Sequence, residues 1–254
     1  MGEAAGEAKI EALGQTAAFV RTESYRFLRD RAGFLLPTVK VEDLAAVSTP
    51  VTSILDAGCG TGINLRHLVD VTGASRGVGV EPSEQSVEQL RIDHAKDSRL
   101  SFETASIHSL PFASNSFDLV VCWSVLHWVG REEYLQALGE LARVTSQWLV
   151  VMDFVAAEDY RVPYHHHDGL FTYKMDFEAP LAASGLVETV AAVQWWEPQA
   201  TGDRVVLGPY DLRPFRERHV NYHSRKVCTF RKNLNVLQLL VEDDFQQEDP
   251  TATA

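Results

Sequence analysis

The middle of the chain alternates between two patterns of hydrophobic and polar residues. Short runs rich in β-branched residues, typical of buried strands, alternate with stretches in which apolar residues recur at helical spacing. The runs are VTSILD, RGVGVE, LSFETA, FDLVVCW and QWLVVMDF, and the helical stretches cover 63–71, 84–95 and 131–144. Because βαβ alternation builds a parallel sheet with crossover helices, the pattern predicts an α/β, Rossmann-like fold with helices on both faces.

The region before this core has a different pattern. Apolar residues at roughly helical spacing between residues 8 and 31 predict one or two amphipathic helices. We expect them to form an N-terminal helical lid over residues 1–40, followed by the core at 41–154.

The region after the core loses the alternation. Residues 155–182 are rich in aromatic and polar side chains and follow a strand, so we expect an acceptor-binding insertion there, at the carboxyl end of the sheet. A helix near 178–184 and several strands should complete the sheet within 183–240. The strands are expected near 187–196, 203–210 and 222–230. An acidic flexible tail is expected at 241–254.

The most informative segment is SILDAGCGTGINLRHL, in which a strand ends at Asp56 and a helix begins after Gly62. In the turn, Gly58, Gly60 and Gly62 occupy every second position, and Cys59 lies between the first two. Glycine permits positive φ and close approach to a ligand, and the amino end of the helix presents N–H groups without helical partners. The segment therefore predicts a loop on which a nucleoside rests.

Two ligand classes compete for such a loop. Dinucleotide sites favour GxGxxG, but Ile63 stands where the third glycine of that motif would be. The segment DAGCGTG instead resembles the E/DxGxGxG motif of the class I S-adenosylmethionine-dependent methyltransferases, and the resemblance extends from about residue 51 to 154. It implies S-adenosylmethionine as cofactor, S-adenosylhomocysteine as product, and a seven-stranded, mostly parallel sheet with an antiparallel last strand. A glycine turn in some other α/β protein is the competing interpretation.

Two further segments extend the cofactor site. Glu81, followed by Pro82, ends the second strand, where an acid can accept hydrogen bonds from both ribose hydroxyls; alternatively it lies beside a helix start that Ser83 caps. The family's DAxxLPF segment around the adenine is SIHSLPF here. The resemblance therefore places Ser106 where an Asp is usual, and Ile107 against the adenine or simply in the core.

The fourth predicted strand and the loop after it, FDLVVCWSVLHWV, also resemble the family. The resemblance implies that Trp123 lies near the methionine part of the cofactor. His127 and Trp128 then face the sulfonium or the acceptor, with Trp128 as a substrate-binding residue. For His127 a packed wall and a catalytic role both remain open.

Methyl transfer from a sulfonium requires alignment of the acceptor and, for a hydroxyl, removal of its proton. The candidate bases are His127, Asp153 and the run 165–167, of which His166 is the preferred member; a solvated loop is the alternative for that run. Neighbouring side chains of an extended segment point to opposite sides, so three consecutive histidines do not converge on one ion. We expect no metal, although Asp153 with Asp168 is a minor option for a divalent cation.

The segment YHHHDGLFTYKMDF resembles, more weakly, one found after the fifth strand in bacterial methyltransferases of sugar-related pathways. It implies that Tyr164, His166, Tyr173 and Lys174 line an acceptor pocket. The preferred activity is methylation of a hydroxyl on a small molecule, sugar-related or a natural product. N-methylation, a non-catalytic S-adenosylmethionine-binding protein and a nicotinamide oxidoreductase are the alternatives.

Composition narrows the partners. The net charge of −12 disfavours nucleic acid, and no apolar run approaches the roughly 20 residues of a membrane span. Three widely spaced cysteines fit a reducing, cytoplasmic setting. We therefore expect a cytoplasmic enzyme with a small-molecule acceptor and neither nucleic-acid nor membrane partners. Whether it is a monomer or a homodimer stays open.

Overall fold

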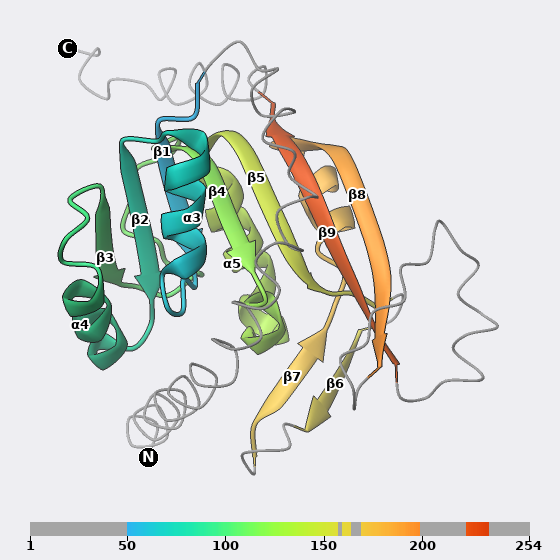
Figure 1. The fold of residues 1–254 in the computed structure, drawn as a ribbon. Helices are drawn as coiled ribbons and strands as arrows, with labels where there is room; N and C mark the ends of the chain where they lie inside the picture. Colours follow the sequence, from blue (N-terminus) through green and yellow to red (C-terminus); the bar gives the residue numbers. More distant parts are fainter. Residues whose placement is uncertain (1–49, 157–158, 164–168, 199–221, 234–254) are drawn as a thin grey trace, which may run out of the picture.

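The computed structural model describes residues 50–156, 159–163, 169–198 and 222–233 (Figure 1). The described elements follow the predicted alternation. In chain order they are β1 (Ser53–Ala57), α3 (Ile63–Thr72), β2 (Arg76–Glu81), α4 (Glu84–Asp93), β3 (Leu100–Thr104), β4 (Phe117–Trp123), the 3-10 turn η1 (Leu126–Trp128), α5 (Arg131–Val144), β5 (Thr145–Phe154), β6 (Tyr160–Pro163), β7 (Phe171–Lys174), α6 (Glu178–Ala183), β8 (Val187–Pro198) and β9 (Tyr222–Lys232).

Seven of these strands form one sheet in the order β3-β2-β1-β4-β5-β9-β8. Strands β1 to β5 pair in parallel, whereas β9 is antiparallel to both β5 and β8. The predicted seven-stranded, mostly parallel sheet with an antiparallel last strand is therefore confirmed. Its strand order reverses between β1 and β4, which is where open α/β sheets bind their ligands.

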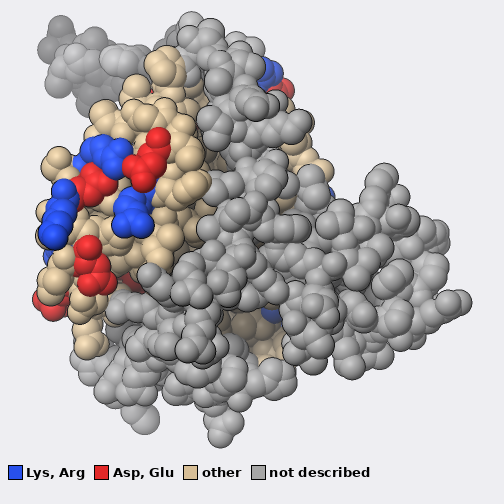
Figure 2. Space-filling model, viewed as in Figure 1, with Lys and Arg blue, Asp and Glu red and all other residues tan. Residues whose placement is uncertain are grey.

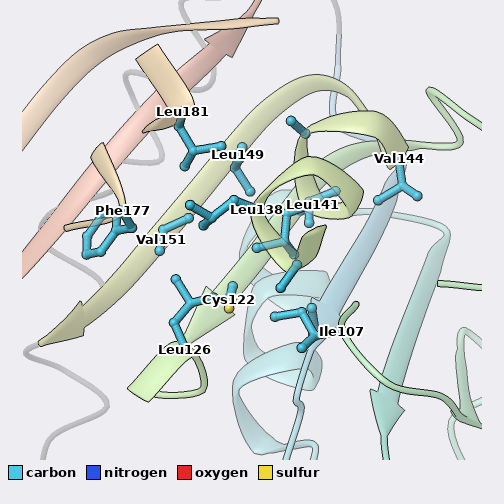
Figure 3. Close-up of a cluster of buried hydrophobic side chains, with 14 of the residues drawn as sticks. Ile107, Cys122, Leu126, Leu138, Leu141, Val144, Leu149, Val151, Phe177 and Leu181 are labelled. Carbon is cyan, nitrogen blue, oxygen red and sulfur yellow. The ribbon is translucent and has the colours of Figure 1, made fainter. Parts of the chain in front are cut away.

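Helices cover both faces of the sheet, α3 on one and α5 on the other (Figure 1). Successive strand residues point to opposite faces, so Ile54 belongs to the same buried cluster as Leu65 of α3, whereas Leu55 belongs to the cluster of Leu141 of α5. The α5 side is the larger cluster, and Figure 3 shows Leu138 of this helix among the side chains facing β5. Burial on both faces explains why the strands read as continuous apolar runs.

The junction between α5 and β5 has no intervening loop. The helix ends at Val144 and the strand begins at Thr145, whose hydroxyl donates to the carbonyl of Leu141 (2.6 Å). The segment TSQ at 145–147 is thus the first part of the strand.

The region after β5 contains an element that the sequence interpretation did not assign. β6 and β7 pair as a separate antiparallel hairpin within the predicted insertion, and Figure 1 shows it beyond the carboxyl end of β5. The helix expected near 178–184 is α6, and two of the three later strands are β8 and β9. The third, near 203–210, lies outside the described residues, as do the predicted lid at 1–40 and the tail at 241–254.

Candidate active site

The carboxyl ends of the parallel strands bring together four predicted site residues. Asp56 on β1 pairs with Val121, which places it two residues from Trp123, the last residue of β4. Glu81 ends the neighbouring β2, and Asp153 stands one residue before the end of β5. Parallel pairing thus assembles this edge from segments up to about a hundred residues apart in the chain.

The glycine loop is held against the end of β2 by backbone groups. The N–H groups of Gly58 and Cys59 both donate to the carbonyl of Val80, at 2.9 and 3.0 Å, and the N–H of Gly60 donates to Oε2 of Glu81 (3.2 Å). The loop and Glu81, separate motifs in the sequence, are therefore in direct contact. Glu81 is half-buried, and its Oε2 faces the loop, while its contact with a ribose stays a prediction.

All three loop glycines have positive φ, at 82° for Gly58, 54° for Gly60 and 71° for Gly62. They differ in what surrounds them. A Cβ at Gly58 would lie 2.4 Å from a methyl carbon of Val125, whereas a Cβ at Gly60 would have no atom of the described residues within 4 Å. Gly58 is thus required by packing within the protein, and Gly60 faces open space where a ligand can approach.

The Asp56 carboxyl is almost completely buried, at 2% exposure. Burial, and secondly the neighbouring Glu81 carboxylate, raises its pKa from 3.8 to about 7. Its Oδ2 accepts no hydrogen bond within the described residues. A buried acceptor without a donor is costly, and a cationic or N–H-bearing ligand beside it would remove that cost.

These observations fit S-adenosylmethionine. Gly60 leaves space at the loop, and Gly62 begins α3 without a side-chain cap, so the N–H groups of its first turn can face a ligand. Asp56, which is partly ionised near pH 7, and Glu81 bring two carboxyl groups to the same edge, and a ligand carrying a sulfonium and an ammonium group would favour their ionised forms. The loop and these two carboxyl groups are the residues that would hold it.

The remaining predicted cofactor residues occupy different environments. Trp123 and Ile107 are both buried, and Ile107 belongs to the core cluster on the α5 side. Pro82 is exposed beside Glu81. The Ser106 hydroxyl lies 2.8 Å from Nδ1 of His108, a residue that the sequence interpretation did not single out. The adenine contacts of Ser106 and Ile107 stay predictions.

His127 and Asp153 form a buried pair at the far side of this edge. Nδ1 of His127 lies 2.8 Å from Oδ1 of Asp153, and the backbone N–H of His127 donates to Oδ2 (3.3 Å). The His127 side chain is 9% exposed and that of Asp153 is 1% exposed. A carboxylate accepts only, so this contact places a hydrogen on Nδ1, and in the neutral imidazole the lone pair is then on Nε2.

Local structure fixes the orientation of the pair. After β4, Ser124 adopts a φ of 57°, and its N–H donates to the carbonyl of Met152 (2.8 Å), which turns the chain into η1. The His127 ring packs against Trp128 at 5.0 Å and edge-on against Phe154 at 5.1 Å. An imidazole held in this way has one orientation, as a positioned base requires.

The negative charge of Asp153 reaches other buried groups. Burial, with Asp153 and Asp56 as further causes, raises the pKa of the Cys122 thiol well above its usual value. Burial and then Asp153 likewise raise the pKa of the Tyr134 hydroxyl. Both groups stay neutral near pH 7, so neither supplies a base at this site.

The predicted acceptor residues are placed only in part. Lys174 on β7 is buried, with Nζ 3.9 Å from the Phe154 ring centroid and donating to Oγ1 of Thr172 (2.8 Å). β7 runs beside η1, so Lys174 and the half-buried Tyr173 lie near His127. Tyr164, His166 and the rest of the histidine run lie outside the described residues. The acceptor roles stay predictions.

Four features bear on the predicted partners, metal use and cellular setting. Figure 2 shows acidic and basic side chains interleaved on the face that carries α3, where Arg99 pairs with Asp70 at 2.7 Å and with Asp97 at 2.6 Å. Within the described ranges no helix is long and apolar enough to cross a membrane. The described residues contain no group of three or more His, Cys, Asp or Glu side chains able to hold a metal ion. The three cysteines are buried free thiols.

Comparison with known proteins identifies a methyltransferase domain in the part of the chain that carries the glycine loop. Residues 54–147 match the family model described as a methyltransferase domain. An uncharacterized methyltransferase of Schizosaccharomyces pombe is 30% identical over 143 residues, 53% of this chain and 48% of that protein. An O-methyltransferase of Penicillium expansum is 30% identical over 135 residues, 52% and 47% of the two chains. The chain spans less than half the length of the curated relatives it matches.

Among solved structures, the fold also resembles that of a methyltransferase. A S-adenosylmethionine-dependent methyltransferase of Methanosarcina mazei superposes with a TM-score of 0.55 at 15% identity, covering 74% of this chain and 96% of that one. At this identity the likeness concerns the fold. The family match is confined to residues 54–147, and this part of the chain, with the glycine loop at the strand-order reversal, is a methyltransferase domain similar to those of the class I S-adenosylmethionine-dependent enzymes.

Proposed function

We propose that the protein transfers a methyl group from S-adenosylmethionine to a hydroxyl of a small molecule, with His127 as the general base. The observation that carries the hydroxyl assignment is the buried His127–Asp153 pair at the sheet edge that also holds the glycine loop. The similarity to an O-methyltransferase of Penicillium expansum supports the same acceptor chemistry. A sugar-related compound or a natural product remains the preferred acceptor.

When bound, S-adenosylmethionine supplies a methyl group on a positively charged sulfur, which keeps the electron pair of the broken bond. The chain must therefore align the acceptor and accept its proton. Nε2 of His127 takes that proton, and the Asp153 carboxylate on Nδ1 stabilises the resulting imidazolium and keeps the ring in the required tautomer. Trp128 and Phe154 hold the ring from two sides and limit its access to water.

The first experiment is titration calorimetry with S-adenosylmethionine, S-adenosylhomocysteine and NADH in parallel. We expect micromolar binding of the first two and none of NADH. Binding of NADH alone, or of none of the three, would overturn the assignment of the cofactor. Binding then justifies a screen of hydroxylated and amine acceptors with methyl-labelled cofactor.

The second experiment separates the base from the binding site. His127→Gln keeps the size of the side chain but cannot take a proton, so kcat on a hydroxyl acceptor should fall by about 10²–10⁴-fold while the Kd for S-adenosylhomocysteine changes little. The matched control is His67→Gln on α3, which should alter neither. Full activity of His127→Gln would remove His127 as the base, and turnover of amines alone would replace the hydroxyl by a nitrogen acceptor.

A further inference from the structure

The peptide unit between Thr61 and Gly62, at the end of the glycine loop, is held from both sides. Its N–H donates to the carbonyl of Cys59 (2.9 Å), and its carbonyl oxygen lies 2.9 Å from Nε2 of His94. A carbonyl oxygen only accepts, so Nε2 of His94 carries a hydrogen and donates it. Peptide planes next to glycine rotate easily, since glycine tolerates φ of either sign. The two hydrogen bonds select one orientation.

His94 is itself firmly placed. It ends α4 as its C-cap residue, and its ring lies 5.2 Å from the ring of Phe102 on β3, tilted by 37°. One turn earlier, the Arg91 guanidinium donates from Nε and Nη2 to the carbonyl of Phe102, at 3.1 and 2.9 Å. The imidazole therefore reaches the loop from a helix end that is tied to the neighbouring strand.

The third glycine of the loop leaves the space that the His94 imidazole occupies. Gly62 has a φ of 71°, and a Cβ there would lie 2.8 Å from Nε2 of His94 and 3.0 Å from the Phe102 ring. A side chain at this position would displace the ring that holds the neighbouring carbonyl. The contact joins the glycine motif to a histidine more than thirty residues later.

We propose that His94 is a positioning residue for the cofactor. By holding the Thr61 carbonyl it fixes the turn into α3 and aims the N–H groups of the first helical turn at the ligand. A loop that is ordered before binding loses less conformational entropy on binding. The hydrogen bond from His94 to the Thr61 carbonyl therefore raises the affinity for the cofactor. The inference rests on the cofactor half of the proposed function.

The test compares three variants by calorimetry with S-adenosylhomocysteine and by thermal unfolding. His94→Leu removes the donor, and we expect its Kd to rise about tenfold, as for the loss of one ordering hydrogen bond. His94→Gln keeps an amide N–H near the position of Nε2 and should restore the Kd to within about threefold of the wild type. His67→Leu, a histidine on α3, is the control and should bind as the wild type does.

Two outcomes overturn the inference: a wild-type Kd for His94→Leu, or a Kd for His94→Gln as weak as that of His94→Leu. Should the leucine variant not fold, nitrogen NMR of the wild type decides, with the His94 signal identified by its loss in His94→Gln. A protonated Nε2 with slow exchange supports the inference, and a neutral ring protonated on Nδ1 overturns it. If the wild type itself does not bind S-adenosylhomocysteine, the proposed function fails and this inference falls with it.

Discussion

At the scale of single residues, the three loop glycines have different roles despite similar backbone angles. Gly58 has the Val125 side chain against it, Gly62 has His94 and Phe102, and Gly60 has open space. A sequence motif presents them as equivalent positions. Only Gly60 has the surroundings expected where a ligand, not the protein, excludes a side chain.

This difference predicts how alanine substitutions behave. Gly60→Ala should lower the free energy of unfolding by only about 1–2 kcal/mol, the cost of a left-handed backbone for an L-residue, but raise the Kd for S-adenosylhomocysteine at least about tenfold. Gly73→Ala is a matched control, because Gly73 has a φ of 71° and, among the described residues, no atom lies within 4 Å of a Cβ built there. Chemical unfolding and calorimetry on both variants provide the comparison. Equal affinity of the two would show that no ligand approaches Gly60.

The buried Asp56 carboxyl leads to a separate prediction, about how the free energy of unfolding depends on pH. Its carboxyl has a pKa of about 7 in the folded protein against 3.8 ordinarily, so the folded state binds more protons between these values. Stability must then fall as pH rises through this window, and level off above it. Between pH 5 and 8 the contribution is about 2–3 kcal/mol, and Asp56→Asn should lack it.

Urea unfolding of wild type and Asp56→Asn at both pH values measures this contribution. Glu88→Gln on the exposed side of α4 serves as the control and should keep the wild-type pH dependence. The same slope in Asp56→Asn as in the wild type would mean that the buried carboxyl is already ionised at pH 5.

At the scale of elements, Asp118 joins three strands at the edge opposite the site. Its Oδ2 accepts from the N–H and hydroxyl of Thr52 and from the N–H of Ser53, at 2.8, 2.7 and 3.1 Å. Its Oδ1 accepts from Ser146 and Gln147, at 3.2 and 3.0 Å. The starts of β1, β4 and β5 are thus held in register by one carboxylate. Burial alone would raise the pKa of Asp118, but these hydrogen bonds lower it to about 2.

Asp118→Asn should therefore lower the free energy of unfolding by about 1–3 kcal/mol at pH 7 and leave the Kd for S-adenosylhomocysteine unchanged, since the site lies at the other edge. The folded pKa lies below the ordinary 3.8, so this stabilisation is present above about pH 4 and is lost as pH falls toward 2. Denaturant titrations from pH 2 to 7 measure it. A constant difference between variant and wild type across that range would contradict the role of the charge.

At the scale of the whole molecule, the sequence predicts the sheet better than it predicts the site. Strands buried on both faces leave long apolar runs, so the pattern alone locates β1 to β5 along the chain. The β6–β7 hairpin was missed because each strand has only four residues and lacks clear alternation. Short strands that pair with each other leave little periodic signal.

The site was predicted where chemistry is local and missed where it depends on distant contacts. The glycine loop lies in one segment, and Glu81 follows it at a strand end. By contrast, the hydrogen bond from His94 to the Thr61 carbonyl joins residues 33 positions apart. No spacing rule connects this pair, because the folded sheet alone brings α4 beside the loop. The roles of Tyr164 and His166 stay predictions.

The position of β9 also determines when the sheet can be completed. It lies between β5 and β8 although it follows both in the chain, so β8 has no place in the sheet until β9 is present. At about 5–20 residues per second, a nascent chain would expose the hydrogen-bonding edge of β5 for several seconds before residues 222–232 leave the ribosome. An exposed strand edge of this kind is a template for aggregation. The newly made protein is therefore most prone to aggregate in the interval before β9 has been synthesised.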